Sequence, residues 1–520
     1  MAEPPALHRA LVPPGLIVQS GDIVDTVVNI GLTITDHNDL RQPVLAETVP
    51  TVENGLWKLL PDGQMELTWT IRAGAAWHDG TPLTVDDFLF TIKVVQDAEL
   101  GEFRTPVSNL VSRVERVDDR TFRTIWPSPT YRADRLFSMG TETVATPLPR
   151  HLLETAYQES KDGFRQLAYW SNDYIGLGPY KVRDWVKGSH LTLAAHDTYV
   201  LGRPKIDELE VRFILDANTA VANILAGAVE TTIGTGLNLE QSIEVRDQWS
   251  GGRLNVAIDS FIFAVPQFIN PQPAVVTDVR FRRALLHAID RQAMADTIQA
   301  GLVPIAHSYI RPDEPEYRAT ERFLTKYDYS PTRAAQILEG MGYVKGPGGV
   351  YQDAAGQRLA MEVRATASPA IHAKSLFPIV DDWQRLGLAI ESVVIPVQRL
   401  SDFEYRTTHP SFEILRNRNG ANRIDTLHGS QTPLPQNRFS GQNRPRYQNA
   451  EFDGLLDRYL ATIPFEPRML ALGEVVRHIT EQLNIMSLFY DVQPSLIGNR
   501  LQNVTTQNLT WNIHLWDVRS

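Results

Sequence analysis

Residues 69–88 read WTIRAGAAWHDGTPLTVDDF and predict a strand, a turn and a helix in succession. Residues 67–72 alternate between apolar and polar side chains, as a half-buried strand does. Gly80–Pro82 predicts a turn, and Thr84 with Asp87 three positions later is typical of a capping box at a helix start. The helix after this box would present one apolar face, made up of Phe88, Leu89, Ile92 and Val95.

Strands and helices also alternate outside that stretch. Residues 121–126 form another alternating strand that stops at Pro127, and residues 191–193 and 209–213 read as strands on either side of a turn-rich segment. Helix starts are predicted at Asp278, Asp290 and Ser330. No fixed-period repeat or low-complexity tract interrupts this pattern, which favours an α/β fold with mixed sheets.

Length and composition place the chain among ordinary folded proteins. Its 520 residues suggest about three domains. Hydrophobic residues make up 43% and charged residues 21% of the chain, unlike the profile of disordered proteins. The formal charge of −11 argues against broad nucleic-acid binding, which needs a basic face.

Cysteine and long apolar runs are both absent from the sequence. Without cysteine there are no disulfides, thiolate metal sites or cysteine nucleophiles. No run approaches the roughly 20 apolar residues of a membrane helix. The first residues, MAEPP, have neither the basic nor the apolar region of an export signal.

The familiar enzyme motifs are missing as well. The sequence has no G-x-S-x-G elbow, no P-loop and no H-E-x-x-H motif. His190 and His196, the two histidines closest in sequence, lie in or beside a strand and lack the spacing of a helical metal pair. Residues 176–180 read GLGPY, which predicts a tight turn into a strand rather than a phosphate loop. We therefore predict no catalytic residues, no metal and no cofactor.

One polar stretch could bind a ligand. Residues 413–425 read EILRNRNGANRID and carry three arginines and three asparagines after an apolar, strand-like run. Arginine binds carboxylates or phosphates through two hydrogen bonds, and asparagine can both donate and accept. A solvated surface loop is the alternative.

Several segments of the sequence resemble motifs of one family, the family-5 extracellular solute-binding proteins. These are the oligopeptide, dipeptide and nickel receptors of ABC importers. The resemblance is carried by residues 69–88 and, in family order, by residues 43–47, 61–63, 178–182, 202–205, 278–291 and 329–343.

The resemblance implies a two-lobed periplasmic-binding-protein fold of the α/β class, with mixed sheets flanked by helices. Lobe I would comprise residues 1–45, 172–265 and 488–520, with an inserted domain at 46–171, and lobe II would comprise 266–487. Hinge strands would lie near residues 261–270 and 488–494. In this reading residues 69–88 belong to the scaffold and not to the ligand site.

The implied function is capture of a peptide or other small polar solute between the lobes, by hinge closure, for an ABC permease. Such a protein is not an enzyme and is expected to be a monomer at the periplasmic or extracellular face of the cytoplasmic membrane. Many members are lipoproteins anchored through an N-terminal cysteine. The lack of cysteine suits a chain that starts after both the signal and the anchor.

The candidate site departs from the family in one respect. Peptide receptors often carry a "GW…D" stretch whose aspartate pairs with the peptide ammonium, but the tryptophan is absent here and arginines surround Asp425. We therefore expect a ligand with an anionic group, clamped by Arg416 or Arg418. Asp425 would orient an arginine or accept from a ligand amine. The predicted contacts are Arg416, Arg418, Asn419, Arg423 and Asp425, with Phe261 and Phe263 as apolar walls.

Two other functional classes remain open from the sequence. A secreted hydrolase acting on peptides or glycans could assemble its site from distant residues. A receptor that signals without transport, or a secreted chaperone, could use the same scaffold.

Overall fold

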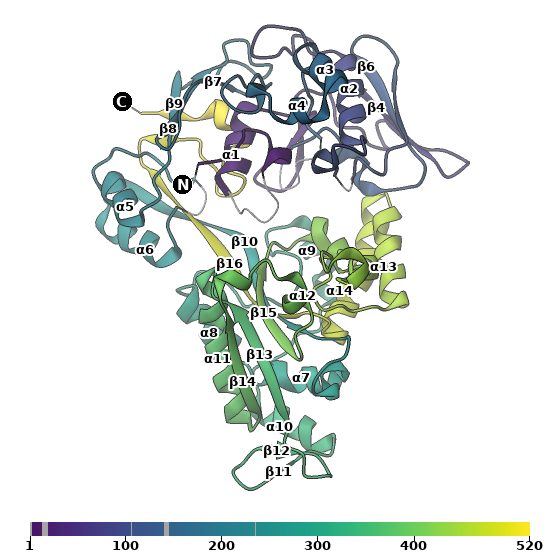
Figure 1. Ribbon diagram of the computed structural model, residues 1–520, viewed down its shortest axis with the longest axis vertical. Coiled ribbons are helices and arrows are strands. Elements are labelled where there is room, and N and C mark those ends of the chain that lie inside the picture. The colour runs from purple at the N-terminus through teal and green to yellow at the C-terminus, as the bar shows by residue number, and fades with distance from the viewer. Residues whose placement is uncertain (1–2, 13–18, 106, 140–144, 234–235, 520) are drawn as a thin grey trace. The chain divides into compact units, whose positions relative to one another are not determined.

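The computed structural model describes residues 3–12, 19–105, 107–139, 145–233 and 236–519, and the chain divides into two compact units (Figure 1). Unit 1 comprises Met1–Ala257 and Gln493–Ser520, and unit 2 comprises Ile258–Val492. Two strands pass from one unit to the other: β10 (Gly252–Pro266) and β16 (Met486–Gly498).

The strand predicted at residues 67–72 belongs to the first sheet of unit 1, and the predicted helix packs on that sheet. Its strand order is β3-β4-β6-β5, all antiparallel. The bounds are β3 (Trp57–Leu59), β4 (Met65–Thr70), β5 (Arg113–Arg116) and β6 (Thr121–Trp126). Helix α2 (Val85–Val95) packs on this sheet through Phe88, whose ring stacks on Phe122 at 4.7 Å. The backbone N–H of Thr84 donates to Asp87 Oδ2 at 3.0 Å, so the predicted helix start is confirmed.

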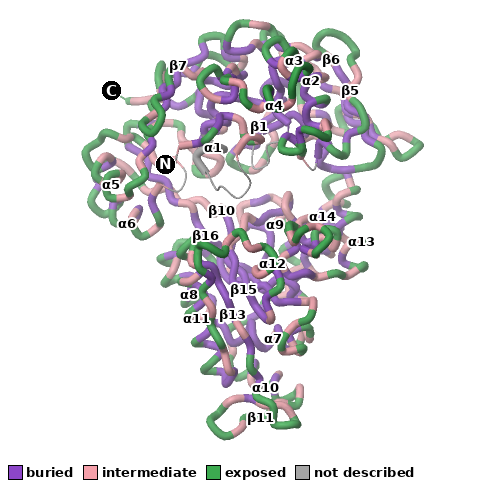
Figure 2. The backbone as a smooth tube through the Cα atoms, viewed as in Figure 1, coloured by how far each residue is buried: buried purple, intermediate pink, exposed green. Residues whose placement is uncertain are grey.

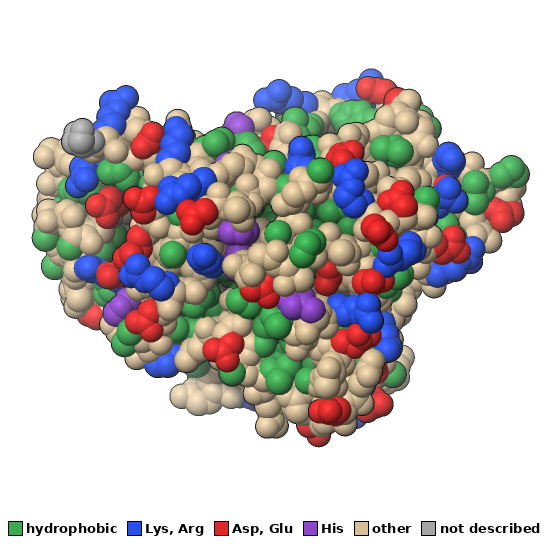
Figure 3. Space-filling model, turned by 90° about the horizontal axis from the view of Figure 1, so that it is seen from above, with side chains coloured by type: hydrophobic (Ala, Val, Ile, Leu, Met, Phe, Trp, Pro, Cys, Tyr) green, Lys and Arg blue, Asp and Glu red, His purple; other side chains and the backbone are tan. Residues whose placement is uncertain are grey.

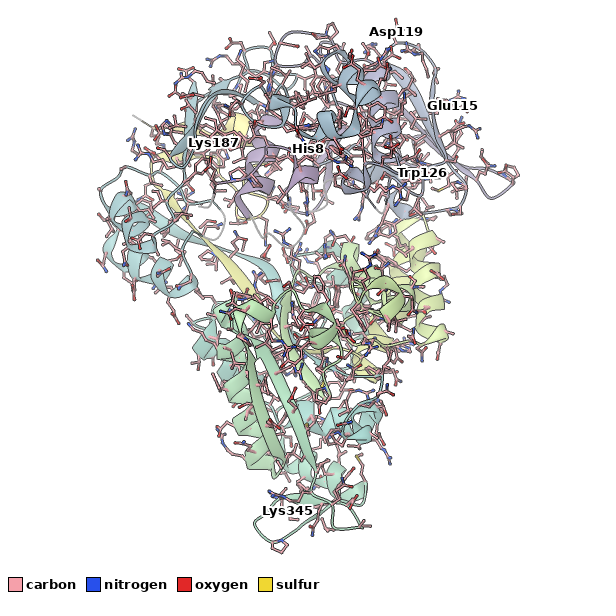
Figure 4. All side chains as sticks on the ribbon, in the orientation of Figure 1. His8, Glu115, Asp119, Trp126, Lys187 and Lys345 are labelled. Atoms are coloured by element: carbon pink, nitrogen blue, oxygen red, sulfur yellow. The ribbon has the colours of Figure 1, made fainter. Side chains whose placement is uncertain are left out.

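The second sheet of unit 1 has the order β7-β8-β9. Its antiparallel strands are β7 (Tyr180–Val186), β8 (His190–Ala195) and β9 (Glu208–Arg212). Lys187, which is labelled in Figure 4, lies in the turn between β7 and β8. Its ammonium lies over the Trp185 ring, 3.1 Å from the ring centroid. The predicted strands at 191–193 and 209–213 are thus confirmed, with β9 ending one residue early.

His78, which lies in the stretch 69–88, is hydrogen-bonded to the turn at residues 176–180. Its Nδ1 accepts from the backbone N–H of Gly176 at 3.1 Å, which leaves Nε2 to donate to the carbonyl oxygen of Gly178 at 3.0 Å. Burial lowers the pKa of His78 to about 3, so the ring is neutral in this role. The turn at residues 176–180 leads into β7 as predicted.

We expect Gly178→Ala to destabilise unit 1. A Cβ at this position would overlap backbone atoms of Val27 and Val28. Backbone atoms cannot move aside as the end of a flexible side chain can. Overpacking of this kind costs about 1–3 kcal/mol of unfolding free energy, measurable by urea denaturation. Gly101→Ala is the matched control because a Cβ there meets nothing within 4 Å. Equal stability of the two variants would contradict the prediction.

Further elements complete unit 1. They are α1 (Gln19–Val28), β1 (Thr33–Thr35), β2 (Arg41–Pro43), α3 (Arg150–Glu159), α4 (Lys161–Arg165), α5 (Ala217–Leu225), α6 (Leu239–Gln248), β17 (Leu501–Gln502) and β18 (Asp517–Val518).

Unit 2 is built on one five-stranded mixed sheet with the order β14-β13-β15-β10-β16. Strand β13 (Ala360–Thr366) pairs in parallel with β14 (Ala389–Ile395) and β15 (Phe412–Asn417), whereas β15 and β10 are antiparallel. Helix α11 (Ala370–Leu386) makes the crossover between β13 and β14. Its buried Trp383 meets Phe412 of β15 with the ring centroids 5.2 Å apart. The strands at the centre of this unit are largely buried (Figure 2).

The predicted helix starts of unit 2 are confirmed. The side chains of Asp278, Asp290 and Ser330 accept from backbone N–H groups at the starts of α7, α8 and α10. The smaller elements of the unit are α7 (Val279–His287), α8 (Arg291–Ile298), α9 (Pro315–Thr320), α10 (Pro331–Gly340), β11 (Val344–Lys345), β12 (Tyr351–Gln352), α12 (Phe403–Thr407), α13 (Ala450–Ala461) and α14 (Phe465–Gln482).

Over the residues described, the structure contains no helix with the length and apolarity needed to cross a membrane.

Candidate functional site

Arg416 lies near the end of β15, where two aspartates from neighbouring segments of unit 2 meet it. Its Nη2 is 3.1 Å from Asp259 Oδ2 on β10, and its Nε pairs with Asp491 Oδ2 on β16. Asp491 also accepts from Gln299 Nε2 at 2.7 Å and from Ser260 Oγ at 3.2 Å. Three adjacent strands are therefore joined through this one guanidinium.

The environment of Arg416 favours its charged form. Burial lowers the pKa of Arg416, but the Asp491 and Asp259 carboxylates more than offset that effect, so the pKa is raised. Its backbone N–H donates to His372 Nε2 at 2.8 Å, which fixes the main chain as well. Arg416 is thus held by the protein itself at both backbone and side chain.

Arg418 is the more accessible of the two strand-end arginines. Its Nε lies 3.5 Å from Asp259 Oδ1, so both arginines meet the same carboxylate, and its side chain is 39% exposed against 19% for Arg416. This geometry agrees with the side chains two apart on an extended segment lying on one face. Arg418 can therefore offer part of its guanidinium to a solute.

Asn419 is buried, with 1% of its surface exposed, and neither atom of its side-chain amide bonds to any described residue. Buried amides are almost always hydrogen-bonded, so an unpaired one in a native fold needs an explanation. Its neighbour Gly420 has φ +131°, and a Cβ there would lie 2.5 Å from Glu314 Oε1. Glu314 Oε2 in turn accepts from the backbone N–H of Ala421 at 2.9 Å. The loop after β15 is therefore held in place while the Asn419 amide is left unpaired.

Arg423 and Asp425 lie on the next turn, a 3₁₀ helix over Ala421–Leu427. Arg423 Nη2 is 3.3 Å from Gln442 Oε1, and its carbonyl oxygen accepts from the Tyr309 hydroxyl at 3.3 Å. Both residues are partly exposed. The structure therefore brings Arg416 and Arg418 together on Asp259, and gives Arg423 different neighbours.

Phe261 and Phe263 are packed inside unit 2. The two rings stack at 4.5 Å with an interplanar angle of 12°, and Phe261 meets the Tyr309 ring edge-on at 5.3 Å. Both are buried in this structure. Their role as apolar walls of a ligand site stays a prediction.

Four residues of this region escaped the sequence analysis: Asp259, Asp491, Gln299 and Glu314. Asp259 interrupts the apolar run of β10, and Asp491 interrupts that of β16. A lone acid within an apolar strand is a usable signal, because buried carboxylates are nearly always paired with a cation.

Charge is balanced in the cluster made by Arg416, Arg418, Asp259 and Asp491, with two cations and two anions. An anionic solute would therefore gain specific hydrogen bonds here rather than a strong net field. On the face of the molecule drawn in Figure 3, basic and acidic side chains are interspersed. Among the described residues, no group of three histidine, aspartate or glutamate side chains is placed to hold a metal.

Comparisons with known proteins agree on one family. The model of the bacterial extracellular solute-binding proteins, family 5 (Middle), matches residues 42–439. A Brucella ovis protein assigned to ABC-transporter peptide binding is 28% identical over 56% of this chain and 51% of its own length. The chain thus spans about half the length of the first curated relatives it matches.

Two solved structures show the same fold. The oligopeptide-binding protein of Thermus thermophilus, complexed with a pentapeptide, has a TM-score of 0.72 at 20% identity and covers 99% of this chain and 95% of its own. NikA from Brucella suis, in complex with Fe(III)-EDTA, has a TM-score of 0.78 at 16% identity, over 100% of this chain and 99% of its own.

Proposed function

The chain belongs to the bacterial extracellular solute-binding proteins of family 5, and from that premise we propose that it captures a peptide or other small polar solute for an ABC importer. The observation that carries this proposal is the family match, which extends over residues 42–439. Capture takes place at the periplasmic or extracellular face of the cytoplasmic membrane, and the partner is an ABC permease. The known relatives give no support to a hydrolase.

Ligand-dependent closure is the proposed mechanism. Strands β10 and β16 are the segments that pass from one unit to the other, which makes them candidate hinges. Contacts that a solute makes only in the closed form shift the open–closed equilibrium, and the permease then recognises the closed form.

Ligand recovery tests the proposed function. We expect mass spectrometry of the purified protein, or of protein incubated with compounds that raise its melting temperature, to yield a solute in unchanged chemical form. Scattering should show a smaller radius of gyration with that solute than without it, because closure compacts the molecule. Conversion of the solute in proportion to protein concentration would reject the transport function in favour of an enzyme.

We propose that Arg418 and the Asn419 amide contact the solute. Arg418 is half-exposed, and Asn419 has a buried amide with no partner among the described residues. The solutes bound by the two structural neighbours, a pentapeptide and Fe(III)-EDTA, both carry carboxylates, for which arginine is the natural partner. An anionic group is accordingly the expected feature of the solute.

Arg418→Ala should weaken binding of the recovered solute by about 10- to 100-fold in calorimetry, because a charge-assisted hydrogen bond is lost. Stability should change little, since Arg418 is not the residue that joins the three strands. Arg399→Ala is a suitable control: this exposed arginine pairs with Asp402 outside the cluster. Binding within about twofold of wild type for Arg418→Ala would mean that the loop faces solvent only.

A further inference from the structure

Unit 1 contains a cavity of about 540 Å³, whose lining includes none of the four residues of the Arg416 cluster in unit 2. One wall is β9, another is the segment 228–233, and helices α1 and α5 and the C-terminal residues complete the lining. The walls are mainly apolar, with Leu209, Val211, Ile224, Ile233, Leu237 and Trp516 among them. Several of these side chains are only half-buried, so the cavity is open to an incoming molecule.

Strand β9 presents a free backbone edge to this cavity. It is the last strand in the order β7-β8-β9 (Figure 1). The backbone N–H of Ala195 donates to Asp207 O and that of Phe213 donates to Ser189 O, both at 2.8 Å. Because antiparallel pairs alternate, odd-numbered residues of β9 bond to β8 and even-numbered ones point away. Within the described part of the chain, the backbone groups of Glu208, Glu210 and Arg212 therefore have no partner.

The segment 229–233 presents a second free edge. Thr232 N–H donates to Leu496 O at 2.9 Å, and Gly498 N–H donates to Glu230 O at 2.6 Å. These bonds flank an antiparallel bridge between Thr231 and Ile497, so even-numbered residues face β16. Odd-numbered residues point the other way, and the backbones of Val229, Thr231 and Ile233 bond to no described residue.

Two unpaired strand edges thus line one cavity with largely apolar walls. We propose that this cavity takes an extended peptide segment of five residues, which adds to the edge of β9 and to the segment 229–233 as an additional strand. The length follows from the two edges, residues 208–212 and 229–233, each of five residues. Unpaired edges are templates for strand addition, and the flanking apolar walls select apolar side chains at alternate positions.

The charges around the cavity favour an uncharged peptide. Glu208 pairs with Arg183 and Glu210 pairs with Arg212, which leaves the acid Glu230 and the base Arg500 on the lining in balance. Main-chain hydrogen bonds would therefore supply the affinity, and this inference does not depend on the proposed transport function.

The test uses the full chain and the capped peptide acetyl-Thr-Val-Thr-Val-Thr-amide. We expect binding with a dissociation constant on the order of 10–500 µM, since main-chain hydrogen bonds to the two edges supply the affinity. Amide exchange measured by NMR should slow at residues 208, 210, 212, 229, 231 and 233, and stay unchanged at 209 and 211, whose amides already face β8. The same peptide with alternate amides N-methylated should bind at least about tenfold more weakly, since it cannot donate along one edge.

Variants locate the site independently. Glu210→Pro removes only an outward N–H from an edge strand, where proline is tolerated, and should weaken the peptide by about tenfold or more. Glu210→Ala removes the same side chain but keeps the N–H, and should bind like wild type, as should Arg399→Ala in unit 2. No binding, equal binding of the N-methylated peptide, or protection of amides elsewhere would each overturn the proposal. Because the exchange experiment uses wild-type protein, it remains decisive if Glu210→Pro fails to fold.

Discussion

Arg416→Ala is expected to lower the free energy of unfolding by about 3–5 kcal/mol, the cost of leaving the buried Asp491 carboxylate without its cation. Asp491 is 8% exposed and Asp259 20% exposed at the side chain, so water can replace little of the lost interaction. The residue also joins β15 to β10 and β16, the strands that lead out of unit 2. Urea denaturation at neutral pH is the measurement.

A double-mutant cycle separates the ion pair from simple loss of packing. Arg416→Ala combined with Asp491→Asn should recover part of the lost stability, because the uncompensated charge is removed with its partner. Arg416→Lys should rescue only partly, since one ammonium cannot reach two carboxylates as a planar guanidinium does. A loss of less than about 1 kcal/mol in Arg416→Ala, typical of surface ion pairs, would contradict the buried cluster.

The contrast between Arg416 and Arg418 shows what the sequence could predict about this site. Alternation along an extended segment correctly placed the two arginines on one face, because that rule depends only on neighbouring residues. The partners Asp491 and Asp259 lie 75 and 157 residues away in the chain. Sequence spacing carries no information about such pairs, so the sequence does not distinguish the arginine that is paired within the protein from the accessible one.

The elements of the fold that depend on neighbouring residues could also be predicted, whereas contacts between distant residues could not. Thr84 with Asp87, and Ser330 before Pro331, mark helix starts because capping is completed within four residues. The contact between His78 and Gly178 spans 100 residues and appears only in the folded chain. The unpaired edges of β9 and the segment 229–233 also depend on which strands become neighbours, so they could not be read from β-propensity.

Mild acid is expected to destabilise the protein strongly. Burial lowers the pKa of His78 and His409 to about 3, and that of His372 and His514 to about 4. In the unfolded chain these groups titrate near 6.5. Below that pH the unfolded state binds protons that the folded state does not, so stability is fully present above pH 6.5 and is lost as the pH falls toward 4.

The size of this loss in unfolding free energy follows from the number of protons that the unfolded chain binds and the folded chain does not. Each of these four histidines contributes about 1.4 kcal/mol per pH unit once the unfolded form is charged, so together they contribute about 5 kcal/mol per unit to the slope near pH 5. We expect the melting temperature to fall by about 10 °C or more between pH 7 and pH 5. Thermal and urea unfolding across this range give both quantities.

A variant of His409 tests whether the buried histidines cause this pH dependence of stability. Its ring is buried and neither nitrogen bonds to a described residue, so His409→Leu removes a titrating group without breaking a hydrogen bond. The slope between pH 5 and 6 should decrease by about one proton, or about 1.4 kcal/mol per unit. His37→Gln, which changes an exposed histidine, is the matched control variant. Stability that stays flat down to pH 5, or an unaltered slope in His409→Leu, would show that the buried histidines do not control acid unfolding.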